Sequence, residues 1–340
     1  MSPGKDRLDV SPIGSDDHAA WAAFLAASEN GTLFHDLDFL AYHPPGRHRF
    51  EHLIVRRGDA IVALLPGGLT GPADRPIFTS PLGASVGGPA VAPDLGAGEA
   101  LELVEALQVY AQARRWAGLE FTLAPSVYQR PASDLLPFAL FCGGFELRHR
   151  WLCYMLPLAP DGSDRYRSLF RERVATFVRA GKRRGIAVAE GGAEQLGGFL
   201  AVFRDTYARH GTAPTHTPEE IAELLRCLPQ RIRLYVATLG DVPVAGSLVM
   251  LLNARVAYSF YICMSTAHAQ ERGNSIVFAT LLDRLAEQGY SWLDLGPGSS
   301  DRNFNPGVAF FKESLGAVGQ CRDRWCWSVP GKPALTSAGK

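Results

Sequence analysis

The sequence predicts an α/β (α+β) protein, and residues 258–316 carry most of that prediction. In order, they read as a strand, a Gly-containing turn, a helix, a second strand, a polar loop and a helical turn. Tyr258 to Ile262 is largely aromatic and apolar, as in a buried strand. The helix that follows has apolar residues at helical spacing and ends at Gly289. The whole stretch therefore predicts strands and helices that alternate around a shared core.

The first half of the chain predicts the same alternation. Helices are expected at 16–27, within 32–45 and at 99–116, and strands at 52–56, 60–66, 119–123 and within 143–156. The helix at 99–116 is the clearest, because its apolar residues recur at i, i+3, i+4, i+7 and i+11. No catalytic residue is assigned in this half, since His35, His43 and Glu120 all have ordinary turn or strand-edge explanations.

A linker by composition, Pro157 to Asp164, separates the two halves. We therefore expect an N-terminal half at 1–156, a C-terminal half at 157–330 and a disordered tail at 331–340. The linker leads into a basic helix at 165–184. Two explanations of this helix stay open. One is a solvated face whose last cations offset the helix dipole. The other is a patch that contacts phosphate on a nucleotide-linked acceptor, a tRNA or coenzyme A.

Composition excludes several classes of protein. The 340 residues include 34 basic and 34 acidic side chains, so there is no charge excess of the kind that predicts a DNA partner. The six cysteines form no Cys-x-x-Cys pair and read as small hydrophobes. No apolar run approaches the roughly 20 residues that span a bilayer, and the amino terminus has no apolar signal core. We expect a cytoplasmic protein without a transmembrane segment.

Two motifs carry a family resemblance. Gln270-x-x-Gly273-x-Ser275 resembles the Gln/Arg-x-x-Gly-x-Gly/Ala loop with which GNAT acyltransferases hold the pyrophosphate of coenzyme A, although Ser275 replaces Gly or Ala. Phe311-Lys-Glu-Ser-Leu-Gly316 is similar to the closing Phe-Tyr-x-x-Leu-Gly of GNAT domains. Lys at its second position, with Leu293-Asp-Leu-Gly296 upstream, resembles the branch that contains Fem-type aminoacyl transferases and the acyltransferases of polysaccharide operons.

The resemblance covers residues 165–328 well and the first half loosely. It implies a tandem of two GNAT-like halves, each a mixed sheet flanked by helices, although no sequence repeat is visible. It also implies an acyl donor, either acyl-coenzyme A or an aminoacyl-tRNA. No metal is expected, and the sequence contains no zinc-type spacing, Walker loop or Gly-x-Ser-x-Gly motif.

The resemblance and the residue chemistry together name a candidate site. A strand that feeds a Gly-bearing turn at a helix start exposes free backbone N–H groups, which suit a phosphate. The candidate donor-binding residues are Gln270, Gly273, Asn274 and Ser275. The candidate catalytic residues are Lys312, Asp294 and Tyr261. The candidate substrate contacts are Tyr207, Arg209, His210, Arg302, Asn303, Asn305 and Arg173. Several of these residues also have an ordinary structural explanation, such as core packing for a tyrosine or a helix end that meets solvent.

Three functions remain open at this point. The first is transfer of an acyl group from acyl-coenzyme A to an amine, on an amino sugar or a similar small molecule of envelope or exopolysaccharide synthesis. The second is aminoacyl-tRNA-dependent peptidyl transfer of the Fem type. The third is a non-catalytic binding protein that has kept the fold. Retention of Lys312 beside the phosphate-type turn favours an enzyme.

Overall fold

The structure is a computed structural model, and it describes residues 7–129, 131–158, 166–300 and 302–330. The chain forms two compact units. Unit 1 runs to Arg150 and takes in the chain again from Cys321, and unit 2 is Trp151–Gln320. The expected boundary at 156/157 differs from this division, because strands β8 (Glu146–Pro157) and β16 (Val318–Ser328) each begin in one unit and end in the other. The linker at 159–164 and the expected tail at 331–340 lie outside the described residues.

Unit 1 contains two sheets, one in the strand order β1-β2-β3-β6 and one in the order β4-β5-β7-β16. Its other strands are β1 (Asp9–Pro12), β2 (Leu53–Arg57), β3 (Ala60–Leu65), β4 (Gly68–Thr70), β5 (Ile77–Ser80), β6 (Ala90–Val91) and β7 (Gly118–Thr122). Its α-helices are α1 (His18–Ala27), α2 (Leu37–Ala41), α3 (Ala97–Ala113) and α4 (Leu135–Cys142). The second sheet is mixed, because β5 and β7 are parallel whereas β7 and β16 are antiparallel.

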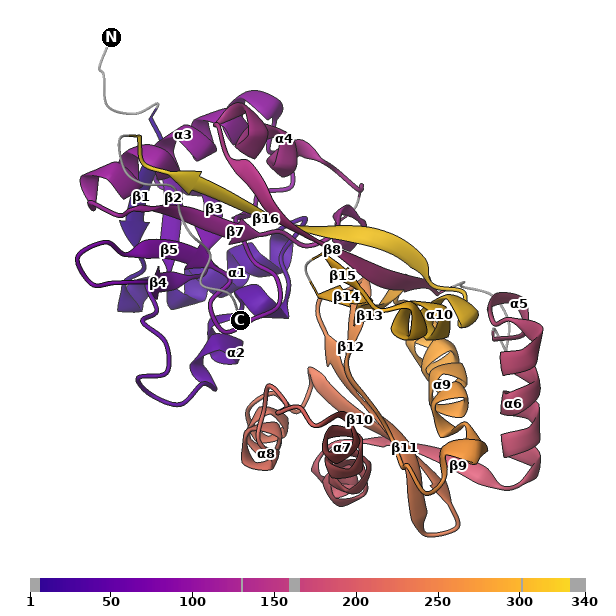
Figure 1. Cartoon of the computed structure of the whole chain (residues 1–340). Coiled ribbons are helices and arrows are strands. Elements are labelled where there is room, and N and C mark those ends of the chain that lie inside the picture. The colour runs from indigo at the N-terminus through magenta and orange to yellow at the C-terminus, as the bar shows by residue number, and fades with distance from the viewer. Residues whose placement is uncertain (1–6, 130, 159–165, 301, 331–340) are drawn as a thin grey trace. The chain divides into compact units, whose positions relative to one another are not determined.

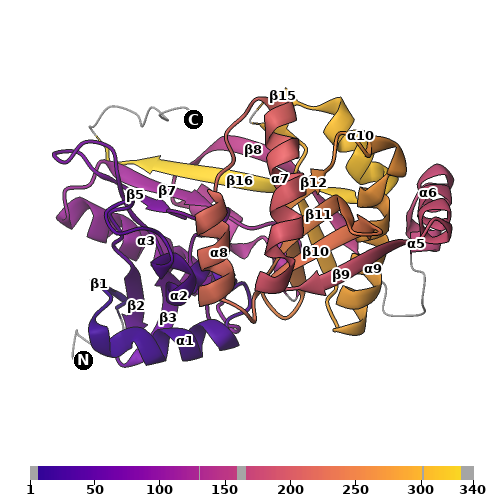
Figure 2. The ribbon, with the colours of Figure 1, turned by 90° about the horizontal axis from the view of Figure 1, so that it is seen from below.

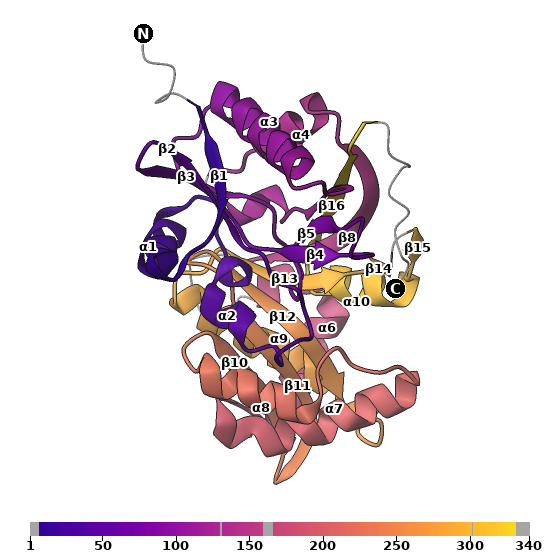
Figure 3. The same ribbon diagram turned by 90° about the vertical axis from the view of Figure 1, so that its left-hand side faces the viewer.

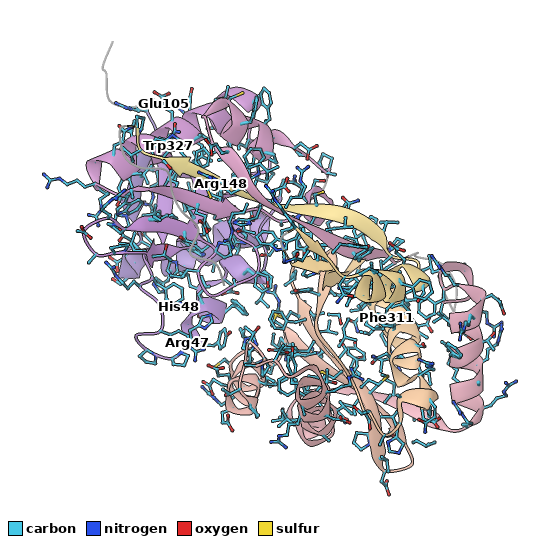
Figure 4. The ribbon with its side chains drawn as sticks, viewed as in Figure 1. Arg47, His48, Glu105, Arg148, Phe311 and Trp327 are labelled. Carbon is cyan, nitrogen blue, oxygen red and sulfur yellow. The ribbon has the colours of Figure 1, made fainter. Side chains whose placement is uncertain are left out.

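The core of unit 1 lies under α3 and α4, which run side by side (Figure 3). All five apolar residues of the predicted stripe on α3 are buried, which confirms the amphipathic helix. Trp116, just beyond α3, stacks on Phe78 of β5 with ring centroids 5.1 Å apart. Trp327 of β16, labelled in Figure 4, stacks on Phe145 in the same core.

Unit 2 contains the sheet order β8-β13-β12-β11-β10-β9. Its strands besides β8 are β9 (Ile186–Gly191), β10 (Ile232–Leu239), β11 (Val242–Leu251), β12 (Val256–Met264) and β13 (Trp292–Pro297), with a small hairpin of β14 (Ser299–Ser300) and β15 (Asn303–Phe304). Its α-helices are α5 (Tyr166–Leu169), α6 (Glu172–Arg183), α7 (Leu196–His210), α8 (Pro218–Cys227), α9 (Gly273–Glu287) and α10 (Pro306–Ser314). This sheet is also mixed, since only β12 and β13 pair in parallel.

Helices cover both faces of this sheet. Helix α9 lies on one face with α6 beside it, and α7 lies on the other (Figures 1 and 2). Helices α6 and α9 approach closely at Gly181, where an added Cβ would lie 2.1 Å from Cδ1 of Ile276. On the other side of α9, Phe278 meets the ring of Phe311 on α10 at 6.0 Å (Figure 4). These contacts place the last turn of α6 and the middle of α10 against the first two turns of α9.

Two irregularities of β12 shape that region. Its parallel pairing with β13 covers only Val256–Tyr258, whereas β12 itself continues to Met264. Beyond Tyr258, this edge of β12 has no partner among the described strands. The antiparallel register with β11 also skips Phe260, because Ser259 and Tyr261 pair with consecutive residues. Such a β-bulge bends a strand and redirects its side chains.

The basic helix predicted at 165–184 is not continuous. It divides into α5 and α6, because Arg171 adopts an extended backbone (φ −55°, ψ 143°) and caps α6. The backbone N–H of Arg171 donates to the carbonyl of Ser314, far along the chain, at 2.9 Å. The division therefore results from a tertiary contact, which the local sequence does not encode.

Candidate functional site

A cavity of about 690 Å³ lies in unit 2 and is lined by residues of α6, α9, α10, β12 and β13. Most of its wall is apolar, with Phe177, Ile262, Met264, Leu295 and Phe311 among its lining residues. Four cationic side chains also line it, and none of the described lining residues is acidic. They are Arg171, Arg173, Arg272 and Lys312. The cavity thus combines an apolar interior with a cationic wall.

Lys312 forms part of the inner wall. It is 5% exposed, and its Nζ donates to the carbonyls of Gly296 at 3.0 Å and Pro297 at 2.8 Å. A buried ammonium needs such acceptors, because desolvation of an unbonded charge is costly. These bonds hold the amino group against the end of β13.

Asp294 shapes the same strand end. Its carboxylate is buried and accepts a 2.6 Å hydrogen bond from the backbone N–H of Gly296. Gly296 has a φ of +76°, a conformation that glycine adopts without strain. The turn presents the Gly296 carbonyl to Lys312. Asp294 does not line the cavity itself, so the structure gives it a supporting position.

The Tyr258 hydroxyl lies next to Lys312. A Cβ placed on Gly296 would lie 3.4 Å from the Tyr258 hydroxyl and 3.9 Å from the Lys312 Nζ, so both groups border the same small volume. Tyr258 lines the cavity and is 6% exposed. The inner end of the cavity therefore holds an amino group and a phenol close together.

The start of α9 forms the opposite end. Asn274 and Ser275 line the cavity, as their predicted role requires. Asn274 Oδ1 is buried and has no hydrogen-bond partner among the described groups. Helix α9 has no side-chain cap, and the first N–H groups of an α-helix have no intrahelical acceptor.

The other two predicted donor-binding residues do not line the cavity. Gln270 is exposed in the short 3₁₀ turn before α9. Gly273 packs on β11, and a Cβ there would lie 2.8 Å from Cβ of Ala245. The glycine of this loop is thus explained by helix-on-sheet packing. Arg272, just before it, has a left-handed backbone with φ 53°.

Each of the arginines that line the cavity lies over an aromatic ring. Arg171 lies over Phe310 at 5.1 Å. Arg173 of α6 and Arg272 lie over the same ring, that of Phe177, at 5.8 and 5.4 Å. Guanidinium groups are attracted to the faces of aromatic rings. Arg173, a predicted substrate contact, is therefore part of this cavity.

Tyr261 and Tyr207 belong to a different cluster. The Tyr261 hydroxyl accepts from the backbone N–H of His216 at 3.0 Å and lies 2.8 Å from its Nδ1. Burial raises the pKa of Tyr261, and it raises the pKa of Tyr207 to about 12. The Tyr207 ring packs edge-on against Tyr261 at 6.0 Å. Neither tyrosine lines the cavity, so both lie outside the candidate site.

The remaining predicted contacts also lie elsewhere. Arg209 is exposed near the end of α7, and the side chain of His210 is outside the described part of the chain. Arg302 and Asn303 lie in the exposed β14–β15 hairpin. Asn305 caps α10, since its side chain accepts from the Val308 N–H at 3.1 Å.

Two cavity residues, Phe177 and Arg272, were not among the predicted site residues. Arg272 lies within the loop motif at Gln270 to Ser275, and Phe177 lies in the predicted basic helix. The sequence did contain a signal that separates Tyr258 from Tyr261, because successive side chains of a strand point to opposite faces. Tyr258, Phe260, Ile262 and Met264 all line the cavity, and Tyr261 falls outside this alternation.

Within the described ranges, no three or more His, Cys, Asp or Glu side chains come together in a way that could hold a metal ion. No helix in the described part of the chain combines the length and apolar composition that crossing a bilayer requires.

Comparison with known proteins supports the GNAT resemblance for unit 2. Residues 168–304 match the family model described as an acetyltransferase (GNAT) domain. This region of the chain is therefore similar to a GNAT-type acetyltransferase domain. A comparison with curated proteins finds no match.

Solved structures resemble the chain over nearly its whole length. The structure of FemX is similar with a TM-score of 0.73 at 13% identity, covering 94% of this chain and 97% of FemX. A tandem GNAT protein from the clavulanic acid biosynthesis pathway is similar at 0.54 and 15% identity, covering 97% of this chain and 100% of that one. The C-terminal domain of a putative lysylphosphatidylglycerol synthetase from Agrobacterium fabrum is similar at 0.57 and 13% identity, covering 93% and 92%. At these identities the likeness shows the fold, which confirms the predicted fold class.

Proposed function

We propose that the chain is an N-acyltransferase that binds acyl-coenzyme A in the unit 2 cavity and transfers the acyl group to an amine. One observation carries the proposal. The cavity joins the uncapped start of α9 to the Tyr258 hydroxyl and the Lys312 amino group, which both lie near Gly296, along the strand edge that β13 leaves open. The GNAT domain match at 168–304 supports a transferase.

The residues of the cavity fit such a donor. At about 3.3 Å per residue, Tyr258 and Met264 are roughly 20 Å apart along β12, which suits the extended arm between the phosphates and the thioester of coenzyme A. The open edge of β12 offers backbone groups to the amides of that arm. Asn274 Oδ1 offers an acceptor that has no partner among the described groups. When bound, coenzyme A supplies an acyl group activated as a thioester.

The inner end of the cavity supplies the protein's own chemistry. The Lys312 amino group is a positive charge fixed by two carbonyls, and such a charge stabilises negative charge that develops on a nearby oxygen. The Tyr258 hydroxyl is a proton donor of suitable reach for a leaving thiolate. Asp294 holds the turn at Gly296 that presents the carbonyl to Lys312. The apolar wall keeps water away from these groups.

The acceptor follows from the family resemblance alone. We propose an amine on a small molecule, such as an amino sugar, in envelope or exopolysaccharide metabolism. Aminoacyl-tRNA is tested as the alternative donor, because FemX is among the similar structures.

Thermal unfolding with acetyl-coenzyme A, longer acyl-coenzyme A and charged tRNA tests the donor. A ligand at about 100 times its dissociation constant should add roughly 2.7 kcal/mol to the free energy of unfolding. Release of free thiol in the presence of a panel of amines and amino sugars then tests transfer. Stabilisation by acyl-coenzyme A, with amine-dependent thiol release, is the expected result. If only charged tRNA stabilises the protein, aminoacyl-tRNA replaces acyl-coenzyme A as the proposed donor. If no ligand stabilises it, a non-catalytic binding protein is favoured.

A further inference from the structure

We propose that the rim of the unit 2 cavity is a docking surface for an acidic carrier protein, which presents the acyl group on a phosphopantetheine arm. This proposal rests on the proposed function, because coenzyme A and such a carrier insert the same arm into the same cavity. It names the partner that holds the arm, a protein surface in place of a free nucleotide.

The rim consists of the cavity-lining residues that are themselves exposed. Among the described lining residues these are three arginines, two apolar side chains and a glycine, namely Arg171, Arg173, Arg272, Val308, Phe310 and Gly307. The interior, by contrast, contains the buried Tyr258 and Lys312. The exposed opening of the cavity is therefore both cationic and apolar.

The charge of the rim is not neutralised by the described residues. None of its three arginines pairs with a described acidic side chain, although other cations close to them do. Arg179 of α6 pairs with Glu172, and Arg184, just beyond α6, pairs with Glu271. Unneutralised guanidinium groups around one opening attract and steer an anionic partner. Charge complementarity thus favours a partner that is acidic around the base of its arm.

The apolar part of the rim favours a protein partner. Phe310 is 60% exposed and Val308 is 36% exposed, and Phe304, shortly before them in the chain, is 55% exposed. The Arg171 guanidinium lies 5.1 Å from the centre of the Phe310 ring. Aromatic and arginine side chains are enriched at protein–protein interfaces. The phosphates of coenzyme A or of a tRNA satisfy the arginines but leave the apolar side chains in water, whereas an acidic protein surface with apolar side chains covers both.

The rim is also held in place before a partner arrives. The backbone N–H of Arg171 donates to the carbonyl of Ser314, which ties the start of α6 to the end of α10. Asn305 caps the other end of α10. A surface that is already ordered loses little conformational freedom on binding. The cationic and apolar parts of the rim can therefore meet a partner as one surface.

The arm then connects the rim to the reacting groups. The open edge of β12 spans roughly 20 Å between Tyr258 and Met264, which suits an extended phosphopantetheine arm on either carrier. During transfer the amine nitrogen bonds to the acyl carbon as the carbon–sulfur bond breaks. The carrier keeps the arm as a free thiol, which takes up the proton that the amine loses.

Calorimetric titration of the full chain tests the docking surface with four probes: acetyl-pantetheine, acetyl-coenzyme A, an acetyl-loaded bacterial acyl carrier protein and charged tRNA. Phe310→Ser and Arg171→Glu change the apolar and the cationic part of the rim. Phe138→Ser is the matched control for the first, because Phe138 is 55% exposed on α4 of unit 1. Arg226→Glu is the control for the second, since Arg226 is exposed on α8 and does not line the cavity.

We expect the wild type to bind the loaded carrier protein at least about tenfold more tightly than acetyl-pantetheine or acetyl-coenzyme A. Phe310→Ser and Arg171→Glu should each weaken the carrier protein by about tenfold or more, as for central interface residues. Both variants should bind acetyl-pantetheine within about twofold of the wild type, which also shows that they are folded. The two control variants should bind every probe as the wild type does.

The outcomes separate this proposal from the proposed function. If acetyl-coenzyme A binds and the carrier protein binds no more tightly, or binds independently of the rim, the docking surface is overturned and the donor assignment stands. If only charged tRNA binds and depends on the rim, both are overturned and the rim serves a nucleic acid. If no probe binds the wild type, the donor assignment and the docking surface both fail.

Discussion

Tyr258 and Tyr261 lie three positions apart on β12 and have different surroundings. Tyr258 lines the cavity beside Lys312, whereas Tyr261 bonds to His216 in a buried cluster outside it. Substitution by Phe removes only the hydroxyl at either position, so the two variants form a matched pair. Their different positions lead to different expected effects of the same substitution.

We expect Tyr258→Phe to lower the rate of acyl transfer by about 10²-fold, typical of a lost proton donor, with little change in stability. Tyr261→Phe should leave the rate unchanged and cost about 1 kcal/mol, because the buried N–H of His216 loses its acceptor. Amine-dependent thiol release measures the transfer rate of each variant, and urea unfolding measures its stability. A slow Tyr261→Phe enzyme with normal stability would restore the catalytic role predicted for Tyr261.

Lys312→Met tests the fixed positive charge. The substitution keeps most of the side-chain length, removes the amino group and should lower the rate by about 10²–10³-fold. Donor affinity should change far less, since the predicted donor-binding residues Asn274 and Ser275 line the other end of the cavity. The variant also leaves two carbonyls without a donor, so a loss of about 1–3 kcal/mol in stability is expected. Rates compared at a temperature where both proteins are folded separate the two effects, and an unchanged rate would argue against Lys312.

Two histidines of unit 1, the buried His35 and the half-buried His52, make stability depend on pH. Burial lowers the pKa of His35 and of His52 to about 4, below the value of about 6.5 expected in the unfolded chain. Between those values the unfolded chain binds protons that the folded chain does not, so stability falls as pH falls from 6.5 to 4. Each histidine should contribute about 1.4 kcal/mol per pH unit.

Urea unfolding at pH 7 and pH 5 checks this dependence on the wild type, His35→Gln and His52→Gln. Each variant should flatten the pH dependence relative to the wild type. His18→Gln removes an exposed imidazole whose charge also lowers the pKa of His52, so its effect on the pH dependence should be smaller than that of either other variant. Equal slopes for the wild type and both buried-site variants would contradict the account.

At the scale of elements, the position of α6 against α9 decides where Arg173 and Phe177 lie. Gly181 provides the close approach, and Cδ1 of Ile276 fills the space next to it. Hydrophobic periodicity predicted both helices. It did not predict the break before α6, because the Arg171 N–H bonds to Ser314, more than a hundred residues later.

Gly181→Ala should destabilise the chain by about 1 kcal/mol, as overpacking outweighs the gain in helix propensity. Ile276→Val removes the clashing Cδ1 atom and should recover about 0.5 kcal/mol or more in a double-mutant cycle. Gly197→Ala in α7 is the control, because its Cβ would meet no neighbour within 4 Å. Additive effects of Gly181→Ala and Ile276→Val, measured by urea unfolding, would show that the contact does not limit the approach.

At the scale of the whole molecule, sequence patterns predicted the fold class, and some of the predicted site residues lie together at one cavity. Strong periodicity gave most helices and strands, and the order of motifs placed Lys312, Asn274, Ser275 and Arg173 at what proves to be one cavity. The unit boundary differed, because the end of β16 pairs with β7 of unit 1, a long-range pairing without a local signal. The packing of Gly273 against Ala245 likewise has no local signal, since Ala245 lies on another strand.

Hydrogen exchange with and without saturating coenzyme A tests the central claim, that the unit 2 cavity is the donor site. Binding of coenzyme A in this cavity should slow exchange in three segments, which are 171–177 at the start of α6, 258–264 on β12 and 272–277 at the start of α9. Unit 1, from β1 to α4, should exchange as before. Protection confined to unit 1, or none in those three segments under conditions where coenzyme A is bound, would contradict the account.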